Sequence, residues 1–177
     1  MPDYLLDTNI VRYWYDTHCP QHAKVLARVR EVRQPDPQTQ YVPRLFVSVV
    51  TVGEIEFGHR VAPMPEPSKQ SEYLTFLRGQ CPEPLEIVPH VAEHYGKLKA
   101  WLFDTASDRK MRAKKYRLRQ LIDPTSAEEL QADENDLWIA AQAVTFKLVL
   151  VTHDSRGHFG DLLDRLSAEL QVEDWAR

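Results

Sequence analysis

Short apolar runs that alternate with helical patterns constrain this chain more than any other feature. The clearest runs are Tyr4 to Leu6, Leu45 to Val50 and Leu148 to Thr152. Apolar runs without a polar alternation are typical of strands that are buried on both faces. Strands that are connected through helices pair in parallel with right-handed crossovers. The sequence therefore predicts an α/β fold around a mainly parallel sheet.

The remaining elements follow from helical spacing and from turn residues. Helices are expected from about residue 10, around Glu54 to Gly58, and over about 21–32, 68–80, 91–103 and 133–146. Further strands are expected over 85–88 and 170–172, and a proline-containing loop over 34–43. Ser48 or Thr51 is a plausible cap for the helix that carries Glu54.

Length and composition indicate a globular protein of one ordinary domain. The 177 residues suffice to bury a core, and 43% of them are apolar while 27% are charged. The longest apolar run is too short to cross a bilayer, and the start of the chain lacks the features of a signal peptide. We therefore expect a cytoplasmic protein without a membrane partner. Cys19 and Cys81 form no Cys-x-x-Cys pattern, which favours two idle thiols over a zinc or redox site.

Four acidic residues occupy positions where a strand meets a helix, or lie in the first turns of a helix: Asp7, Glu54, Asp136 and Asp154. Because ligands gather beyond the carboxyl ends of parallel strands, one sheet edge could bring these acids together. Carboxylates without thiolates are the donors that hard cations such as Mg²⁺ or Mn²⁺ prefer. The pattern therefore predicts a divalent-metal site.

Each acid also has a structural explanation when it is taken alone. Asp7 could be only a helix cap, and Glu54 only a solvated helix residue. Asp136 would be favourable charge at a helix start, and Asp154 a turn or cap residue. Four independent caps are a poorer explanation than one site, because the acids recur in specific contexts and in order along the chain. His153 adjoins the last acid, and both a packing role and contact with substrate remain open for it.

A basic strip lies in the second half of a chain whose formal net charge is −4. Seven of its eleven residues are positive: Arg109, Lys110, Arg112, Lys114, Lys115, Arg117 and Arg119. Positive charge beside Tyr116 is typical of a nucleic-acid contact. Two alternatives remain, namely a solvated helix face and pairing with the acidic stretch that follows, within the chain or across a dimer.

The four acidic contexts resemble the motifs of the PIN domain nucleases, and the resemblance covers nearly the whole chain. The matching segments are Leu5-Leu6-Asp7-Thr8-Asn9, residues 48–58 around Glu54, Asn135-Asp136-Leu137-Trp138-Ile139-Ala140-Ala141, and Leu150-Val151-Thr152-His153-Asp154. Within that family the chain is most similar to the toxin ribonucleases of VapBC-type toxin–antitoxin pairs, including its ending Leu170-Gln171-Val172-Glu173-Asp174-Trp175. The fold implied is a three-layer α/β/α arrangement with about five strands.

The resemblance also implies chemistry. The four acids would be the catalytic metal ligands for one or two Mg²⁺ or Mn²⁺ ions, with Asp7, Glu54 and Asp136 on the principal ion and Asp154 positioning a second ion or a water. Supporting polar neighbours would be Thr8, Asn9, Asn135 and Thr152. The expected reaction is hydrolysis of RNA phosphodiester bonds, and the expected partners are RNA and a small antitoxin protein. A homodimer is left open.

Two segments are longer than a compact toxin needs. These are the loop over 34–44 and the stretch over 104–132. We interpret the stretch over 104–132 as a basic and acidic insertion within a single nuclease domain that spans 1–177. The insertions leave two further functions open: a general RNA-processing PIN nuclease, and a non-catalytic module that binds RNA or protein. A haloacid-dehalogenase-like phosphatase is disfavoured, because it needs a second acid two residues after the first, where this chain has Asn9.

Overall fold

The centre of the fold is a parallel sheet. The computed structural model describes residues 2–64, 66–106, 134–153 and 169–177. Within these ranges four strands pair in the order β2-β1-β3-β4. They are β1 (Tyr4–Leu6), β2 (Leu45–Val47), β3 (Val149–Val151) and β4 (Gln171–Glu173). All three pairings are parallel, as the sequence predicts.

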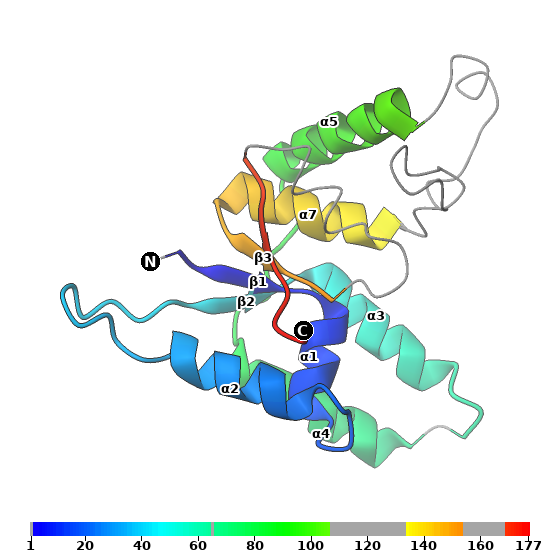
Figure 1. Ribbon diagram of the computed structural model, residues 1–177. Coiled ribbons are helices and arrows are strands. Elements are labelled where there is room, and N and C mark those ends of the chain that lie inside the picture. The colour runs from blue at the N-terminus through cyan, green and yellow to red at the C-terminus, as the bar shows by residue number, and fades with distance from the viewer. Residues whose placement is uncertain (1, 65, 107–133, 154–168) are drawn as a thin grey trace.

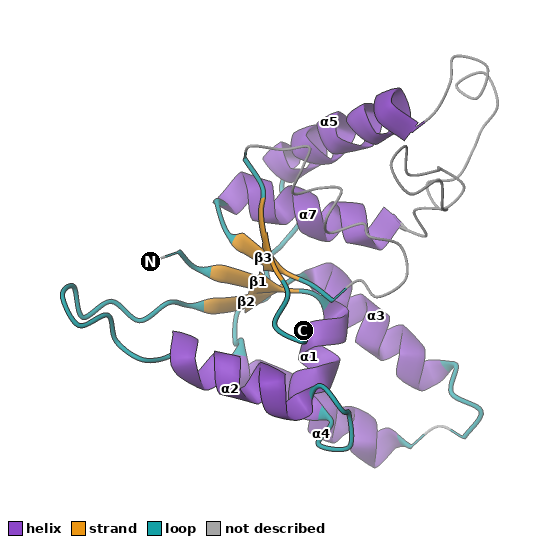
Figure 2. Cartoon of the chain, viewed as in Figure 1, coloured by secondary structure: helices purple, strands orange, loops and turns teal. Residues whose placement is uncertain are grey.

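Helices cover both faces of the sheet, which gives the three layers of an α/β/α fold (Figure 2). The helices are α1 (Thr8–Tyr15), α2 (His22–Val32), α3 (Val49–Arg60), α4 (Pro67–Gln80), α5 (Pro89–Ala106) and α7 (Glu134–Phe146). Figure 1 shows α5 and α7 on one side of the sheet and α1, α2 and α4 on the other. None of these helices is both long and apolar enough to cross a membrane.

Strand β1 shows how the sequence separates the two cores. Tyr4 and Leu6 are buried in the cluster that includes Val25 of α2 and Leu77 of α4. Leu5 points the opposite way, into the cluster that includes Leu137 of α7. Successive strand residues face opposite sides of a sheet, so an apolar run without polar positions is what a doubly covered central strand requires.

Two side-chain caps decide where helices begin at the sheet edge. Asp7 caps α1 through a 2.7 Å hydrogen bond that its Oδ1 accepts from Thr8 N. Ser48 caps α3, because its Oγ accepts from Val50 N at 2.9 Å. The expected strand over 45–50 therefore ends at Val47, and Thr51 lies inside the helix rather than capping it.

The strand expected over 85–88 is reduced to a single bridge between Leu85 and Ser48. Prolines flank the segment at 84 and 89, and Pro has no N–H for a strand ladder. The fully buried Gln142 of α7 holds this segment instead, since its Nε2 donates to Leu85 O and Glu86 O at 2.8 and 3.1 Å. A side chain thus replaces part of the ladder expected for a fifth strand.

Both thiols are free, as the sequence predicts. Burial raises the pKa of Cys81 to about 11, so this thiol stays protonated and unreactive near neutral pH. Of the expected insertion over 104–132, residues 104–106 end α5, and the others lie outside the described residues.

Candidate functional site

Asp7 lies at the carboxyl end of β1, which is the position that the sequence predicts for it. Its side chain is 9% exposed, and two donors orient it. Oδ1 accepts from Thr8 N, and Oδ2 accepts from the Thr152 hydroxyl, each at 2.7 Å. Thr152 follows β3, the strand that pairs with β1. Two neighbouring strand ends therefore hold one nearly buried carboxylate in a fixed orientation.

Thr8 connects this carboxylate to Glu54 of α3. The Thr8 hydroxyl donates a short hydrogen bond to Glu54 Oε2, while the backbone N–H of Thr8 donates to Asp7. The Thr8 hydroxyl also lies 3.2 Å from the hydroxyl of Thr51, which is fully buried. An ionised carboxylate only accepts hydrogen bonds, so Thr8 gives its proton to Glu54 and can accept one from Thr51. One threonine thus joins two acids that stand 47 positions apart in sequence.

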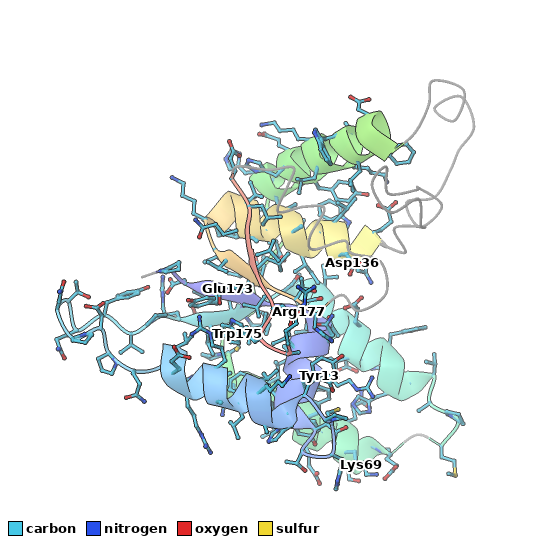
Figure 3. The ribbon with its side chains drawn as sticks, in the orientation of Figure 1. Tyr13, Lys69, Asp136, Glu173, Trp175 and Arg177 are labelled. Carbon is cyan, nitrogen blue, oxygen red and sulfur yellow. The ribbon has the colours of Figure 1, made fainter. Side chains whose placement is uncertain are left out.

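Helix α7 reaches the same place through its first turn. Asn135 Nδ2 donates to Glu54 Oε1 at 2.7 Å, across 81 positions of sequence. Asp136 is the next residue and is partly buried, and Figure 3 shows it at the end of α7 that faces α3. Acidic side chains are favourable in the first turn of a helix, because the N-terminal end of the helix dipole is positive. The first turn of α7 therefore contacts Glu54 through Asn135, and it also carries Asp136.

Asn9 does not orient an acid through any of its described hydrogen bonds. Its side chain forms a reciprocal pair with the backbone of His153: Nδ2 donates to His153 O at 3.0 Å, and Oδ1 accepts from His153 N at 3.2 Å. The His153 ring is held by Asp174 and packs edge-on against Tyr13 at 5.8 Å. These contacts give His153 a packing role within the described residues.

A metal would find oxygen donors here. Glu54 uses two of about four acceptor positions for Thr8 and Asn135, so its carboxylate can still coordinate a hard cation. Across the described ranges, no three side chains of the His, Cys, Asp and Glu types gather closely enough to hold a metal ion, and this includes Asp7, Glu54 and Asp136. Asp154 and the basic strip over 109–119 lie outside the described residues.

A groove of about 910 Å³ opens from the acidic residues between α1, α3 and α4. Thr8 and Glu54 line it, together with the cationic side chains of Arg12 and Lys69. Its remaining lining residues are Tyr15, Asp16, Thr17, His18, Ile55, Gly58, His59, Glu72 and Tyr73. The Tyr15 and Tyr73 rings are stacked, with centroids 4.2 Å apart. Of the two linked acids, Glu54 lines the groove.

Sequence reasoning missed three side chains around this site. Thr51 stands one turn before Glu54 on α3, and this spacing could have marked it as a neighbour. Asp174 and Arg177 carry no such local signal. Asp174 reaches this region through its contact with His153, which is distant in sequence, and Arg177 pairs with Asp174.

Comparison with known families decides what this arrangement belongs to. The sequence matches the PIN domain over residues 4–162, which is most of the chain and includes all four predicted acids. The chain belongs to the PIN domain family. This is a family of nucleases. No curated protein matches the sequence.

Solved structures share the fold of this PIN domain at low sequence identity. A chain of the VapBC2 structure from Rickettsia felis, bound to a DNA fragment from its promoter, aligns with a TM-score of 0.61 and 17% identity, covering 97% of this chain and 98% of that one. A chain of VapBC-1 from nontypeable Haemophilus influenzae aligns with a TM-score of 0.59 and 23% identity, covering 98% of both chains. VapBC-5 from Mycobacterium tuberculosis gives 0.59 and 18%, covering 98% and 99%. Each of these three structures thus covers at least 97% of this PIN domain.

Proposed function

We propose that this PIN domain is a divalent-metal-dependent endoribonuclease that hydrolyses RNA phosphodiester bonds. The observation that carries the proposal is the link from Asp7 through Thr8 to Glu54, with Asn135 of α7 on the other Glu54 oxygen. Such a group of oxygen ligands at the carboxyl edge of a parallel sheet suits Mg²⁺ or Mn²⁺.

Four acids would hold one or two of these ions: Asp7, Glu54, Asp136 and Asp154. When bound, a divalent cation supplies charge neutralisation and activation of water for attack on a phosphodiester. No nucleophilic side chain is then required from the protein. The four carboxylates are the catalytic residues of the proposal.

The neighbouring polar side chains would keep the ligands in place. Thr152 orients Asp7, whereas Thr8 and Asn135 orient the two oxygens of Glu54. Partners that orient a metal ligand commonly change affinity or activity about 10- to 100-fold when they are removed. Asn9 would act indirectly, because its side chain fixes the backbone of His153, the residue after Thr152.

The groove supports an extended substrate. Arg12 lies one turn after Thr8 on α1, so it stands on the same helix face as Thr8. A phosphate strand in the groove would meet the positive charge of Arg12 and Lys69 before it reaches the carboxylates. We also propose that the basic strip over 109–119 binds RNA, within an insertion of a single nuclease domain spanning 1–177.

A cleavage assay tests the metal-dependent activity. Purified protein should cut RNA in Mg²⁺ or Mn²⁺, lose activity in EDTA, and regain it when Mn²⁺ is added in excess. Asp136→Asn should remove most of the activity while it keeps the fold, because the amide preserves shape and removes ligand charge. Full activity of the chelated protein, or unchanged cleavage by Asp136→Asn, would reject the mechanism.

We further propose that the chain is the toxin of a toxin–antitoxin pair. Its fold neighbours occur in VapBC structures from several bacteria, which supports a small protein partner that neutralises the nuclease. Induced expression should arrest growth, Asp136→Asn should relieve the arrest, and co-expression of a small neighbouring gene product should restore growth. An active, soluble enzyme that leaves growth unchanged would instead favour a general RNA-processing nuclease.

A further inference from the structure

The C-terminal segment over 173–177, which begins with the last residue of β4, holds the end of β3 with more than strand pairing. Thr152 N donates to Glu173 O at 3.0 Å, which continues the ladder between the two strands. One residue further on, Asp174 accepts a hydrogen bond from the ring nitrogen Nδ1 of His153 at 2.9 Å. The segment therefore holds two consecutive residues, one through its backbone and one through a side chain.

Asp174 is itself held on two sides. Its Oδ1 accepts from Ala176 N at 2.8 Å, and its Oδ2 pairs with Arg177 Nε at 3.0 Å. The buried Trp175 ring packs against Tyr4 of β1 at 5.2 Å, which anchors the segment to the sheet (Figure 3). The side chains of His153 and Asp174 are only 16% and 18% exposed, so solvent screens their contact less than it screens a surface pair.

A continuous set of contacts leads from Asp174 to Asp7. The backbone of His153 is paired with the Asn9 side chain, and Asn9 stands two residues after Asp7 on the first turn of α1. The residue before His153 is Thr152, whose hydroxyl donates to Asp7 Oδ2. A shift of the His153 backbone would therefore disturb Asp7 through both Thr152 and Asn9.

We propose that Asp174 is a positioning residue, which orients the Asp7 carboxylate by holding the His153 ring and with it the chain that leaves β3. The inference rests on the proposed function, because Asp7 is a ligand only in that function. Within the described residues Asp174 contacts His153, Ala176 and Arg177 and neither of the two acids, so its effect must pass through His153.

Asp3 supplies a matched control at the opposite end of β1. Its side chain is 12% exposed and accepts the backbone N–H of Arg44 at 2.7 Å, the guanidinium of the same Arg44 at 2.9 Å, and a short hydrogen bond from the Tyr41 hydroxyl. Asp3→Asn and Asp174→Asn thus make the same chemical change in the same kind of contact. Only Asp174→Asn replaces one of the two oxygens that face His153 Nδ1 with an amide nitrogen, which cannot accept a hydrogen bond.

The experiment measures cleavage kinetics, Mn²⁺ affinity by calorimetry, and the melting temperature for the wild type and for both variants. We expect Asp174→Asn to lower kcat and weaken Mn²⁺ binding by about tenfold, with a smaller change in KM for RNA. Asp3→Asn should change kcat and Mn²⁺ affinity by less than about twofold, as distant sites do. Equal effects of the two variants would overturn the inference.

A double-mutant cycle with His153→Ala tests the path. If Asp174 acts through His153, adding Asp174→Asn to His153→Ala should cause little further loss of kcat or Mn²⁺ affinity. Losses that multiply would show that Asp174 acts by another route and would overturn the inference. Wild-type protein that binds Mn²⁺ without cutting RNA would reject the proposed function, while the comparison of Mn²⁺ affinities would still decide the role of Asp174. Wild-type protein that binds no Mn²⁺ would overturn both.

Discussion

Thr8 contributes to the candidate site through two different groups. Its backbone N–H donates a hydrogen bond to Asp7, the cap of α1. Its hydroxyl donates a hydrogen bond to Glu54 across the interface between α1 and α3. A cap alone would require only the N–H, which any residue other than Pro supplies. The hydroxyl is therefore the feature of Thr8 that the site uses.

Replacement of this hydroxyl is the first prediction. Thr8→Val keeps the branched shape but leaves the Glu54 carboxylate without one donor and the buried Thr51 hydroxyl without an acceptor. We expect kcat and Mn²⁺ affinity to fall about tenfold or more, as for other partners of metal ligands. Thr8→Ser is the matched control, because it keeps the hydroxyl and should stay close to wild type. Equal activity of the Val and Ser variants would show that the hydroxyl is dispensable.

Helix α7 shows, at the scale of an element, how a helix that carries a site residue is held at both ends. Its first residue, Glu134, pairs with Lys99 of α5 at 2.7 Å and accepts a short hydrogen bond from Tyr95. Its last turn closes with two bonds, from Lys147 N to Val144 O and from Leu148 N to Ala143 O. The first contact positions the turn that carries Asp136, and the second fixes where β3 begins.

The C-terminal closure contains a strained residue, which leads to the second prediction. Lys147 has φ 55°, the left-handed conformation that normally favours Gly after a helix. Lys147→Gly removes a Cβ conflict and should raise the free energy of unfolding by about 0.5–1 kcal/mol. Urea denaturation measures the change. Lys147→Ala keeps the Cβ and should gain nothing, whereas an equal gain from Ala would point to the lysine charge instead.

The N-terminal contact gives a pH-dependent prediction. Burial raises the pKa of Glu134, but hydrogen bonds from Lys99 and Tyr95 lower it more, so the net pKa lies below its ordinary value. A lowered folded-state pKa stabilises the protein above the unfolded pKa, and this stability is lost as the pH falls through the folded value. Glu134→Gln should melt below wild type at pH 7, by no more than about 3 °C for a half-exposed pair.

Melting curves across the acid range test this assignment. The gap between Glu134→Gln and wild type should narrow as the pH falls below the ordinary carboxyl range, because the wild-type side chain then becomes neutral too. A gap that stays constant with pH would assign the difference to packing of α5 on α7 rather than to the charge of Glu134.

Charge is uneven at the scale of the whole molecule. The formal net charge is −4, yet seven positive residues stand within 109–119. An acidic protein that binds a polyanion needs its positive charge to be concentrated, because repulsion by the acids must be overcome locally. We assign this concentration to RNA binding as part of the proposed function.

Reversal of this charge is the fourth prediction. Replacement of Lys110, Lys114 and Lys115 by Glu should weaken binding to long RNA and flatten its salt dependence, by about 0.7 in the log–log slope for each lost phosphate contact. Affinity would be measured at several salt concentrations in the Asp136→Asn background, which suppresses turnover. A control variant in which the exposed Lys24, Arg30 and Lys147 are replaced by Glu changes the net charge by the same amount. The same slope in both triple variants would assign the effect to net charge alone.

The sequence by itself determined the parallel sheet, most helix positions and the place of the acids along the chain. These features depend on neighbours within a few residues: apolar runs for β1 and β3, and side-chain caps at Asp7 and Ser48. They could be predicted because periodicity and capping are local physical effects. The family resemblance that those local motifs carry is likewise confirmed by the match over residues 4–162.

Only the tertiary structure decided which polar groups meet. Thr8 reaches Glu54 across 46 positions, Asn135 reaches Glu54 across 81, and Thr152 reaches Asp7 across 145. The hydrogen bond between His153 and Asp174, and the single bridge at Leu85 in place of the strand expected over 85–88, also depend on tertiary packing. Such contacts depend on how helices cross and where strand ends align, which no local pattern encodes. The sequence thus placed Asp7 at the end of β1 and Glu54 early in α3, and tertiary packing decided how these two carboxylates are oriented.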